Sequence, residues 1–189
     1  MIRDLTLDGG VRLLVETTAA AEVAAVGVWY DRGSRDEGPA EGGSTHVVEH
    51  MLFKGTADLS AADLARRFDA LGGAANAFTE REAMGLHAVV PVEAFEDASL
   101  LLCALVRGAA FDGEEFSREL SVISNELEAA EDDPEEAAAD AYSRRLWGEH
   151  GVGKKIGGEK AEVQALRRDR VYDFYLRRFR GRPSLITVS

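Results

Sequence analysis

Strand-type and helix-type segments follow one another along this chain in an order that few folds accommodate. Residues 11–15 and 23–30 are rich in valine, leucine and aromatic side chains, and residues 75–79 and 84–90 form a second pair of such runs around a charged turn. Helical patterns occupy most of the remaining chain, and an apolar strand follows at residues 185–188. Strands, then helices, then a last strand predict an α+β fold: a two-layer sandwich with a mostly antiparallel sheet and helices packed on one face.

Helix boundaries follow from capping residues and from residues that end helices. Ser60 with Asp63 forms an N-terminal capping pattern, and Asp112 with Glu115 forms another. Pro134 is suited to the first turn of a helix. The helices predicted in this way are residues 46–53, 60–71, 91–108, 112–131, 134–147 and 161–179.

Length and charge limit the classes of function. A chain of 189 residues with 46% hydrophobic composition is expected to form one domain, residues 1–189. The net charge of −12 disfavours nucleic acid or an anionic membrane as a partner and favours basic or unfolded peptides. Residues 1–8 do not resemble a secretory signal and no run of about 18 apolar residues occurs, so a cytoplasmic protein is expected. The single cysteine, Cys103, lies in an apolar run and is predicted to be buried.

The segment His46-Val47-Val48-Glu49-His50 carries the chemistry. Two imidazoles at positions i and i+4 of a helix lie one turn apart on the same face, as two ligands of one metal require. Glu49 is on the same side and can accept a proton from water that zinc has made acidic. The alternative is a chance occurrence on an amphipathic helix, but the apolar residues that follow would make unpaired histidines costly to bury.

A third ligand is needed, because catalytic zinc keeps three protein ligands and one open position. His87 and His150 are candidates, and a carboxylate on the helix after Asp112 is a better one. Glu119 and Glu126 lie on the same side of that helix, at the flank of its apolar stripe. Ordinary surface salt bridges of these two carboxylates remain the alternative. The stripe consists of Phe116, Leu120, Ile123 and Leu127.

The inverted motif resembles the inverzincin family of zinc peptidases, which includes pitrilysin, insulin-degrading enzyme and the β subunit of mitochondrial processing peptidase. The resemblance extends along the chain in the family's order. The segments that carry it are Gly33-Ser34-Arg35-Asp36-Glu37, residues 46–56 (HVVEHMLFKGT), Gly72-Gly73 leading into Asn76-Ala77-Phe78-Thr79, residues 119–126 (ELSVISNE), Asp132-Asp133-Pro134 and Arg182-Pro183. The pair Val47-Val48 departs from the aromatic-Leu pair common in relatives.

The resemblance implies a role for each site residue. Glu126 would be the third zinc ligand beside His46 and His50, and Glu119 a supporting carboxylate that does not bind the metal. The segment Asn76, Ala77, Phe78 and Thr79 would be the edge strand along which an extended peptide is bound. The chain would be the N-terminal zinc-binding domain of a family unit whose second, similar domain closes over the zinc.

These observations predict a zinc metalloendopeptidase domain with one Zn²⁺ per chain, Glu49 as the base, and activity that needs a second homologous domain or subunit. A peptide is the expected substrate. One rival is a non-catalytic or partner-dependent subunit of a peptidase or processing complex, although such halves typically lose motif residues. Another is a closed structural metal site, which would need a fourth protein ligand that the sequence does not offer.

Overall fold

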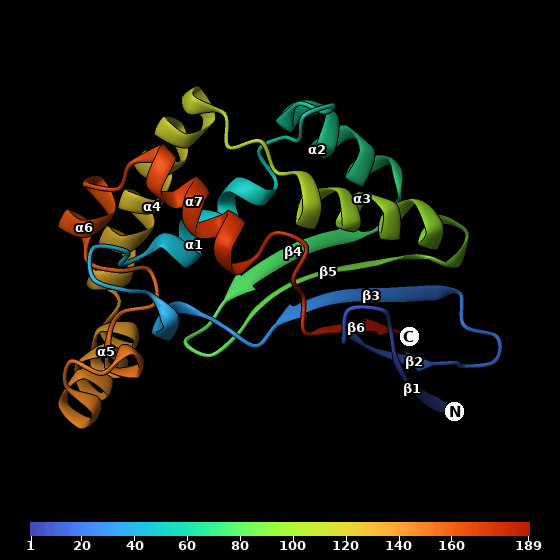
Figure 1. Ribbon diagram of the computed structural model, residues 1–189, viewed down its shortest axis with the longest axis horizontal. Coiled ribbons are helices and arrows are strands. Elements are labelled where there is room, and N and C mark those ends of the chain that lie inside the picture. Colours follow the sequence, from blue (N-terminus) through green and yellow to red (C-terminus); the bar gives the residue numbers. More distant parts are fainter.

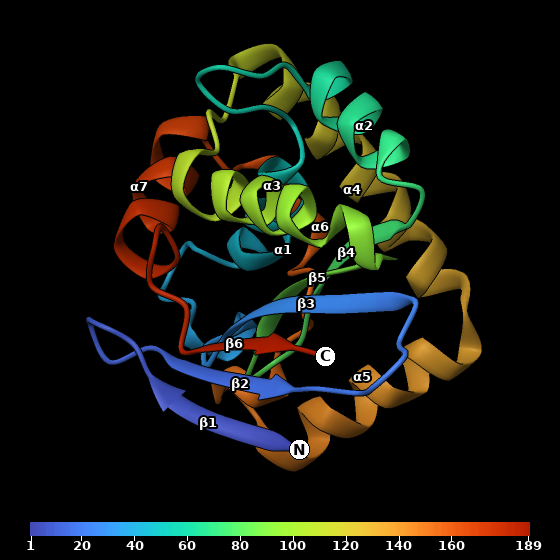
Figure 2. The ribbon, with the colours of Figure 1, turned by 90° about the vertical axis from the view of Figure 1, so that its right-hand side faces the viewer.

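A computed structural model describes all 189 residues, and the chain forms two layers (Figure 1). A six-stranded sheet is one layer, and most of the helices pack on one of its faces to form the other, which confirms the predicted α+β fold; the helix at residues 134–147 lies apart from this layer (Figure 2). The strands are β1 (Ile2–Thr6), β2 (Arg12–Glu16), β3 (Val23–Tyr30), β4 (Ala74–Thr79), β5 (Met84–Pro91) and β6 (Leu185–Val188). The helices are α1 (Ser44–Leu52), α2 (Ala61–Ala70), α3 (Phe95–Gly108), α4 (Gly113–Asp132), α5 (Pro134–Trp147), α6 (Lys160–Gln164) and α7 (Arg168–Arg178), with 3-10 turns η1 (Ser34–Asp36), η2 (Val92–Ala94) and η3 (Gly151–Gly153).

The sheet has the strand order β1-β2-β6-β3-β5-β4. All neighbouring strands are antiparallel except β2 and β6. The last strand of the chain is inserted between β2 and β3, with Val188 opposite Val26. Strand β1 was not predicted, because its five residues are all exposed and show no apolar alternation. Strand β4 is the outermost strand on the other side, so one of its edges is free.

The core lies between the sheet and the helices. Alternate residues of β3 and β5 face the helices, as the period of two along a strand requires. Helix α1 is central in this layer, since Val47, Val48, Met51 and Leu52 are each 0% exposed. Its polar residues are therefore held on a helix with little freedom to move. The inward residues of the two strands are Ala24, Val26, Val28, Tyr30, Met84, Leu86, Ala88 and Val90.

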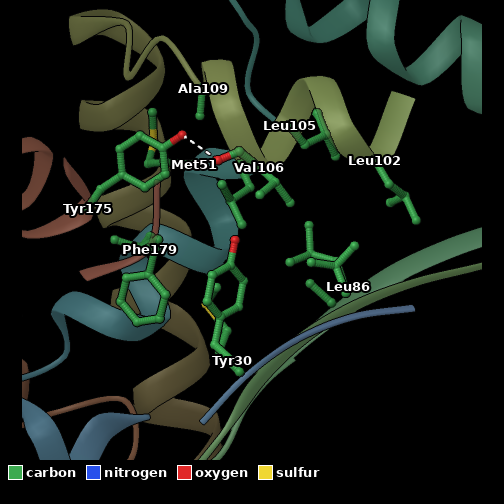
Figure 3. Close-up of a cluster of buried hydrophobic side chains, with 14 of the residues drawn as sticks. Tyr30, Met51, Leu86, Leu102, Leu105, Val106, Ala109, Tyr175 and Phe179 are labelled. Carbon is green, nitrogen blue, oxygen red and sulfur yellow. Dashed lines mark hydrogen bonds between the residues drawn. The ribbon is translucent and has the colours of Figure 1, made fainter. Parts of the chain in front are cut away.

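A cluster of buried hydrophobic side chains, aromatic and aliphatic, joins β3, α3 and α7 (Figure 3). The Tyr175 hydroxyl donates a hydrogen bond to the carbonyl oxygen of Val106 at 3.1 Å. The Tyr30 ring meets Phe179 edge to face, with ring centroids 5.2 Å apart. Unlike Tyr175, the Tyr30 hydroxyl is buried without a hydrogen-bond partner.

The helix predicted at residues 161–179 is wrong in one respect, because the structure divides it into α6 and α7. Arg167 between them has extended backbone angles, φ −110° and ψ 136°. Helix α6 packs against α4, whereas α7 packs against α1. The predicted burial of Cys103 is also wrong, since this residue is exposed. Helix α3 buries Leu101, Leu102 and Leu105, and Cys103 lies on the opposite side.

Candidate metal centre

Helix α1 presents two imidazoles to one point. His46 Nε2 and His50 Nε2 are 3.2 Å apart, and the two ring planes are perpendicular. This follows from the i, i+4 spacing, which stacks both side chains on one face of the helix. The helix begins after Gly43, whose φ of 80° favours glycine. The Glu37 side chain accepts hydrogen bonds from the backbone N–H groups of Gly43 and Thr45, and so caps α1 from the preceding loop.

Glu126 of α4 completes a group of three potential ligands. Its Oε2 lies 3.8 Å from His46 Nε2 and 3.4 Å from His50 Nε2, and all three ligand atoms are within 4.8 Å of one another. Two ligand atoms at normal distances from a tetrahedral zinc would be about 3.3 to 3.4 Å apart. The observed separations are close to that value, and the donor set of two nitrogens and one oxygen suits zinc. The residues present therefore fit the metal.

The protonation of His46 also suits a metal ligand. Burial, with a smaller effect of the neighbouring His50, lowers the pKa of His46 to about 4, so its imidazole is neutral at pH 7. Its Nδ1 is buried without a hydrogen-bond partner. The loop before α6 comes close on this side: a Cβ added at Gly157 would lie 3.4 Å from His46 Nδ1 and only 2.6 Å from Leu127. Only glycine fits there without displacing Leu127.

Glu119 of α4 supports His50 rather than joining the three-residue group. His50 Nδ1 lies 2.9 Å from Glu119 Oε2, a hydrogen bond that places the proton on Nδ1 and leaves Nε2 free to bind a metal. The other oxygen, Oε1, is 2.8 Å from Lys54 Nζ. Burial raises the pKa of Glu119, but the bonds from Lys54 and His50 outweigh this effect and hold it below its usual range.

Glu49 lies beside this group without belonging to it. Its Oε2 accepts a hydrogen bond from the Thr79 hydroxyl at 2.6 Å. Burial raises the pKa of Glu49 above its usual value, while Thr79 and His50 oppose the shift. A carboxylate in this position can take up and release a proton next to the metal centre.

A cleft of about 1100 Å³ opens at the metal centre. Its walls come from α1, β4, the end of α4, α5 and the loop before α6. Arg81 and Lys155 pair with acidic residues of the cleft, Arg81 with Asp140 at 3.0 Å and Lys155 with Glu131 at 2.8 Å. Acidic groups still outnumber basic ones in the lining. The acidic residues are Glu49, Glu126, Glu131, Asp133, Glu136, Asp140 and Glu159, and the basic ones are Arg81, Arg144 and Lys155.

The residues expected to bind substrate lie on edge strand β4, at one side of the cleft. Ala77, Phe78 and Thr79 line the cleft, whereas Asn76 does not. The Ala77 N–H donates to Oδ1 of Asn76 at 2.9 Å, so a side chain serves as its acceptor. The Phe78 ring packs on Trp29, with centroids 5.7 Å apart.

The structure decides between the alternative metal ligands that the sequence analysis left open. His87 lies on β5 opposite Gly27 and Asn76, and His150 accepts a hydrogen bond from the Val152 N–H, so neither joins the three-residue group. Arg118 pairs with Glu114 and Glu115 instead of Glu119 or Glu126. Sequence reasoning missed Lys54, although its position four residues after His50 indicates the same side of the chain.

A group of two histidines and one carboxylate on adjacent helices, with a further carboxylate beside it, is typical of zinc peptidase domains. Family comparison agrees with this class: the sequence matches the family described as Insulinase (Peptidase family M16) over residues 12–160. The chain belongs to this family, and it corresponds to the family's N-terminal domain.

Relatives and solved structures agree with this placement. The chain is 36% identical to an uncharacterized zinc protease of Mycobacterium leprae, over 97% of this chain and 41% of that protein. It is 30% identical to a probable mitochondrial-processing peptidase subunit beta of Arabidopsis thaliana, over 91% of this chain and 32% of that protein. A protease from Helicobacter pylori shares the fold, with a TM-score of 0.92 at 20% identity over 100% of this chain and 46% of that chain. An inactive domain of a peptidase M16 from Pseudomonas fluorescens does so with a TM-score of 0.90 at 17% identity, over 100% of this chain and 46% of that chain.

The chain spans about two fifths of the length of the zinc proteases that it matches. None of its helices has the length and apolar character needed to cross a lipid bilayer.

Proposed function

We propose that this chain is the zinc-binding domain of a metalloendopeptidase that hydrolyses extended peptides. The observation that carries the proposal is the meeting of His46, His50 and Glu126 at one point beside Glu49. Membership of a peptidase family, and the names of relatives as zinc proteases, support it.

In this proposal His46, His50 and Glu126 hold one Zn²⁺ per chain. When bound, zinc supplies a Lewis acid that polarises a peptide carbonyl and makes water acidic near neutral pH. Both imidazoles must be neutral to bind a metal. The low pKa of His46, which burial causes, favours that state for His46, and the Glu119 hydrogen bond to His50 Nδ1 leaves Nε2 of His50 free for the metal.

Glu49 is the proposed base. Its carboxylate accepts a proton from the attacking water and later gives it to the leaving amine nitrogen. The hydroxyl of Thr79 holds Oε2 of Glu49, so the carboxylate is fixed between the metal centre and the edge strand. Glu119 supports catalysis indirectly, by orienting His50.

The proposed substrate is an extended peptide that pairs with the free edge of β4 at Asn76, Ala77, Phe78 and Thr79. Backbone hydrogen bonds would provide most of the binding. A peptide carbonyl could take the place of Asn76 Oδ1 on the Ala77 N–H. The excess of acidic groups in the cleft favours basic segments, such as presequence-like peptides.

Activity is proposed to need a second homologous domain or subunit. Relatives are more than twice as long as this chain, and the cleft at the metal centre is open to solvent. The alternative is a non-catalytic or partner-dependent subunit, which the likeness to the inactive Pseudomonas fluorescens domain favours. The complete set of His46, Glu49, His50 and Glu126 favours the catalytic reading. A cytoplasmic location and the absence of nucleic-acid or membrane partners stay predictions.

Two variants test the proposal. Glu49→Gln should keep one zinc per chain but abolish peptide hydrolysis in the active assembly, because an amide cannot take up the proton. Glu126→Ala should instead lose the metal, since two ligands bind zinc far less tightly than three. Metal analysis and a peptide-cleavage assay measure both effects. Activity of Glu49→Gln within about tenfold of wild type would remove Glu49 from this role, and zinc retention by Glu126→Ala would point to another ligand.

A further inference from the structure

Lys54 lies at the end of a chain of contacts that leads to the metal centre. Its Nζ is 2.8 Å from Oε1 of Glu119, and Oε2 of Glu119 is 2.9 Å from His50 Nδ1. Lys54 follows the last turn of α1, where its backbone N–H donates to the carbonyl oxygen of Met51. The lysine is therefore anchored just beyond the C-terminal end of the helix that carries His50, while Glu119 reaches both residues from α4.

Glu119 depends on this lysine. The residue is only 5% exposed, and a buried carboxylate needs partners for both oxygens. Apart from His50, Lys54 is the cationic side chain within ion-pair distance of Glu119, since the neighbouring Arg118 pairs with other residues. Lys54 therefore provides a permanent positive charge next to the Glu119 carboxylate.

The Lys54–Glu119 contact also connects the segment that follows α1 to α4. Glu119 and Glu126 lie two turns apart on one side of α4. Fixing Glu119 against α1 therefore helps to set the place at which Glu126 meets His46 and His50.

We propose that Lys54 is a positioning residue for the metal centre: it holds Glu119 so that His50 presents Nε2, and α4 presents Glu126, to one ion. The proposal rests on the proposed zinc site. Residues that orient metal ligands in this indirect way typically change metal affinity by about 10- to 100-fold when replaced. Lys54→Met should therefore weaken zinc binding even though it removes no ligand.

The test measures the zinc dissociation constant of the purified chain by competition with a chelator. Lys54→Met should bind zinc about 10- to 100-fold more weakly, and Lys54→Arg should stay within about threefold of wild type because it keeps the charge. Lys155→Met is the matched control. Lys155 has a similar exposure, 26% against 31% for Lys54, and pairs with Glu131 in the cleft rather than with Glu119. The zinc dissociation constant of this control should also stay within about threefold of wild type, since the substitution removes the same charge but leaves the contacts of Glu119 unchanged.

A double variant tests whether Lys54 affects zinc binding through Glu119. In a Glu119→Gln background, Lys54→Met should cause no further loss of zinc affinity, because the residue through which it acts has changed. If Lys54→Met does not fold, Lys54→Gln replaces it with the same expectations.

Three results would overturn the proposal: zinc affinity of Lys54→Met within about threefold of wild type, an equal loss in Lys155→Met, or a full further loss in the Glu119→Gln background. A wild-type chain without measurable zinc binding would contradict the proposed function itself. The two failures are therefore distinguishable.

Discussion

Thr79→Val removes one hydrogen-bond donor from Glu49 and changes little else. The Thr79 hydroxyl donates to Glu49 Oε2 at 2.6 Å, and valine keeps the branched shape of the side chain. Thr79 is the last residue of β4 and is not one of the three proposed ligands, so the metal should stay bound. The substitution isolates the positioning of the base from the binding of zinc.

The size of the effect follows from the kind of hydrogen bond that is lost. A bond to a charged acceptor contributes about 1.5–3 kcal/mol. Because Glu49 borders the open cleft, water can replace part of this bond, so the lower value applies. At about 1.4 kcal/mol for each tenfold change, kcat should fall about tenfold while KM changes little.

The pH profile should shift as well. Burial raises the pKa of Glu49, and Thr79 counteracts this effect, so removal of the hydroxyl raises the pKa further. The acidic limb of the kcat profile should move to higher pH, and the loss of activity should be larger at low pH than at high pH.

The assay is steady-state peptide hydrolysis by the active assembly, with zinc content measured on the same samples. Thr79→Ser should retain most of kcat because it keeps the hydroxyl. Thr187→Val is the control for loss of a threonine hydroxyl, since the Thr187 hydroxyl accepts a hydrogen bond from Trp29 Nε1 and does not contact Glu49. The reasoning is refuted if zinc-loaded Thr79→Val has a kcat within about twofold of wild type, or if Thr79→Ser is equally slow.

Three further predictions concern stability and assembly. Tyr175→Phe should lower the free energy of unfolding by about 0.5–1.5 kcal/mol because it removes the hydrogen bond to the Val106 carbonyl, which keeps only the bond from the Gly181 N–H, whereas Tyr30→Phe should be neutral; equal losses in urea unfolding would contradict this. Burial raises the pKa of Glu37 to about 7, above the unfolded value of about 4.5. Stability from its neutral form is therefore complete below pH 4.5 and lost as pH rises through 7, and Glu37→Gln should flatten this fall; an unchanged pH dependence of unfolding would argue against it. The purified chain should bind zinc but cleave peptides poorly until a partner half is added, because positioning of the substrate can supply about 7–11 kcal/mol of the barrier. Full activity of the chain alone would exclude the need for a second half.

Local spacing made part of this protein predictable from its sequence. His46, Glu49 and His50 share a face because helical geometry depends only on their separation along the chain. The capping pair Ser60 and Asp63 forms the reciprocal hydrogen bonds that its spacing predicts, for the same reason. The α+β class likewise follows from strand and helix periods that are properties of short segments.

The helical stripe alone could not choose between Glu119 and Glu126. Both lie on one side of α4, and the family resemblance made the distinction. In the structure, Glu126 meets both imidazoles whereas Glu119 contacts only His50. That difference depends on the position of α4 along α1. The periodicity of each helix alone does not predict this position.

Only the tertiary structure decided the contacts between segments that are distant in the chain. Insertion of β6 beside β3, division of the last predicted helix into α6 and α7, and the Thr79 bond to Glu49 all belong to this group. The link from Lys54 through Glu119 to His50 belongs to it as well. Each depends on which faces of separate elements pack together, a property of the whole core rather than of any short stretch of sequence.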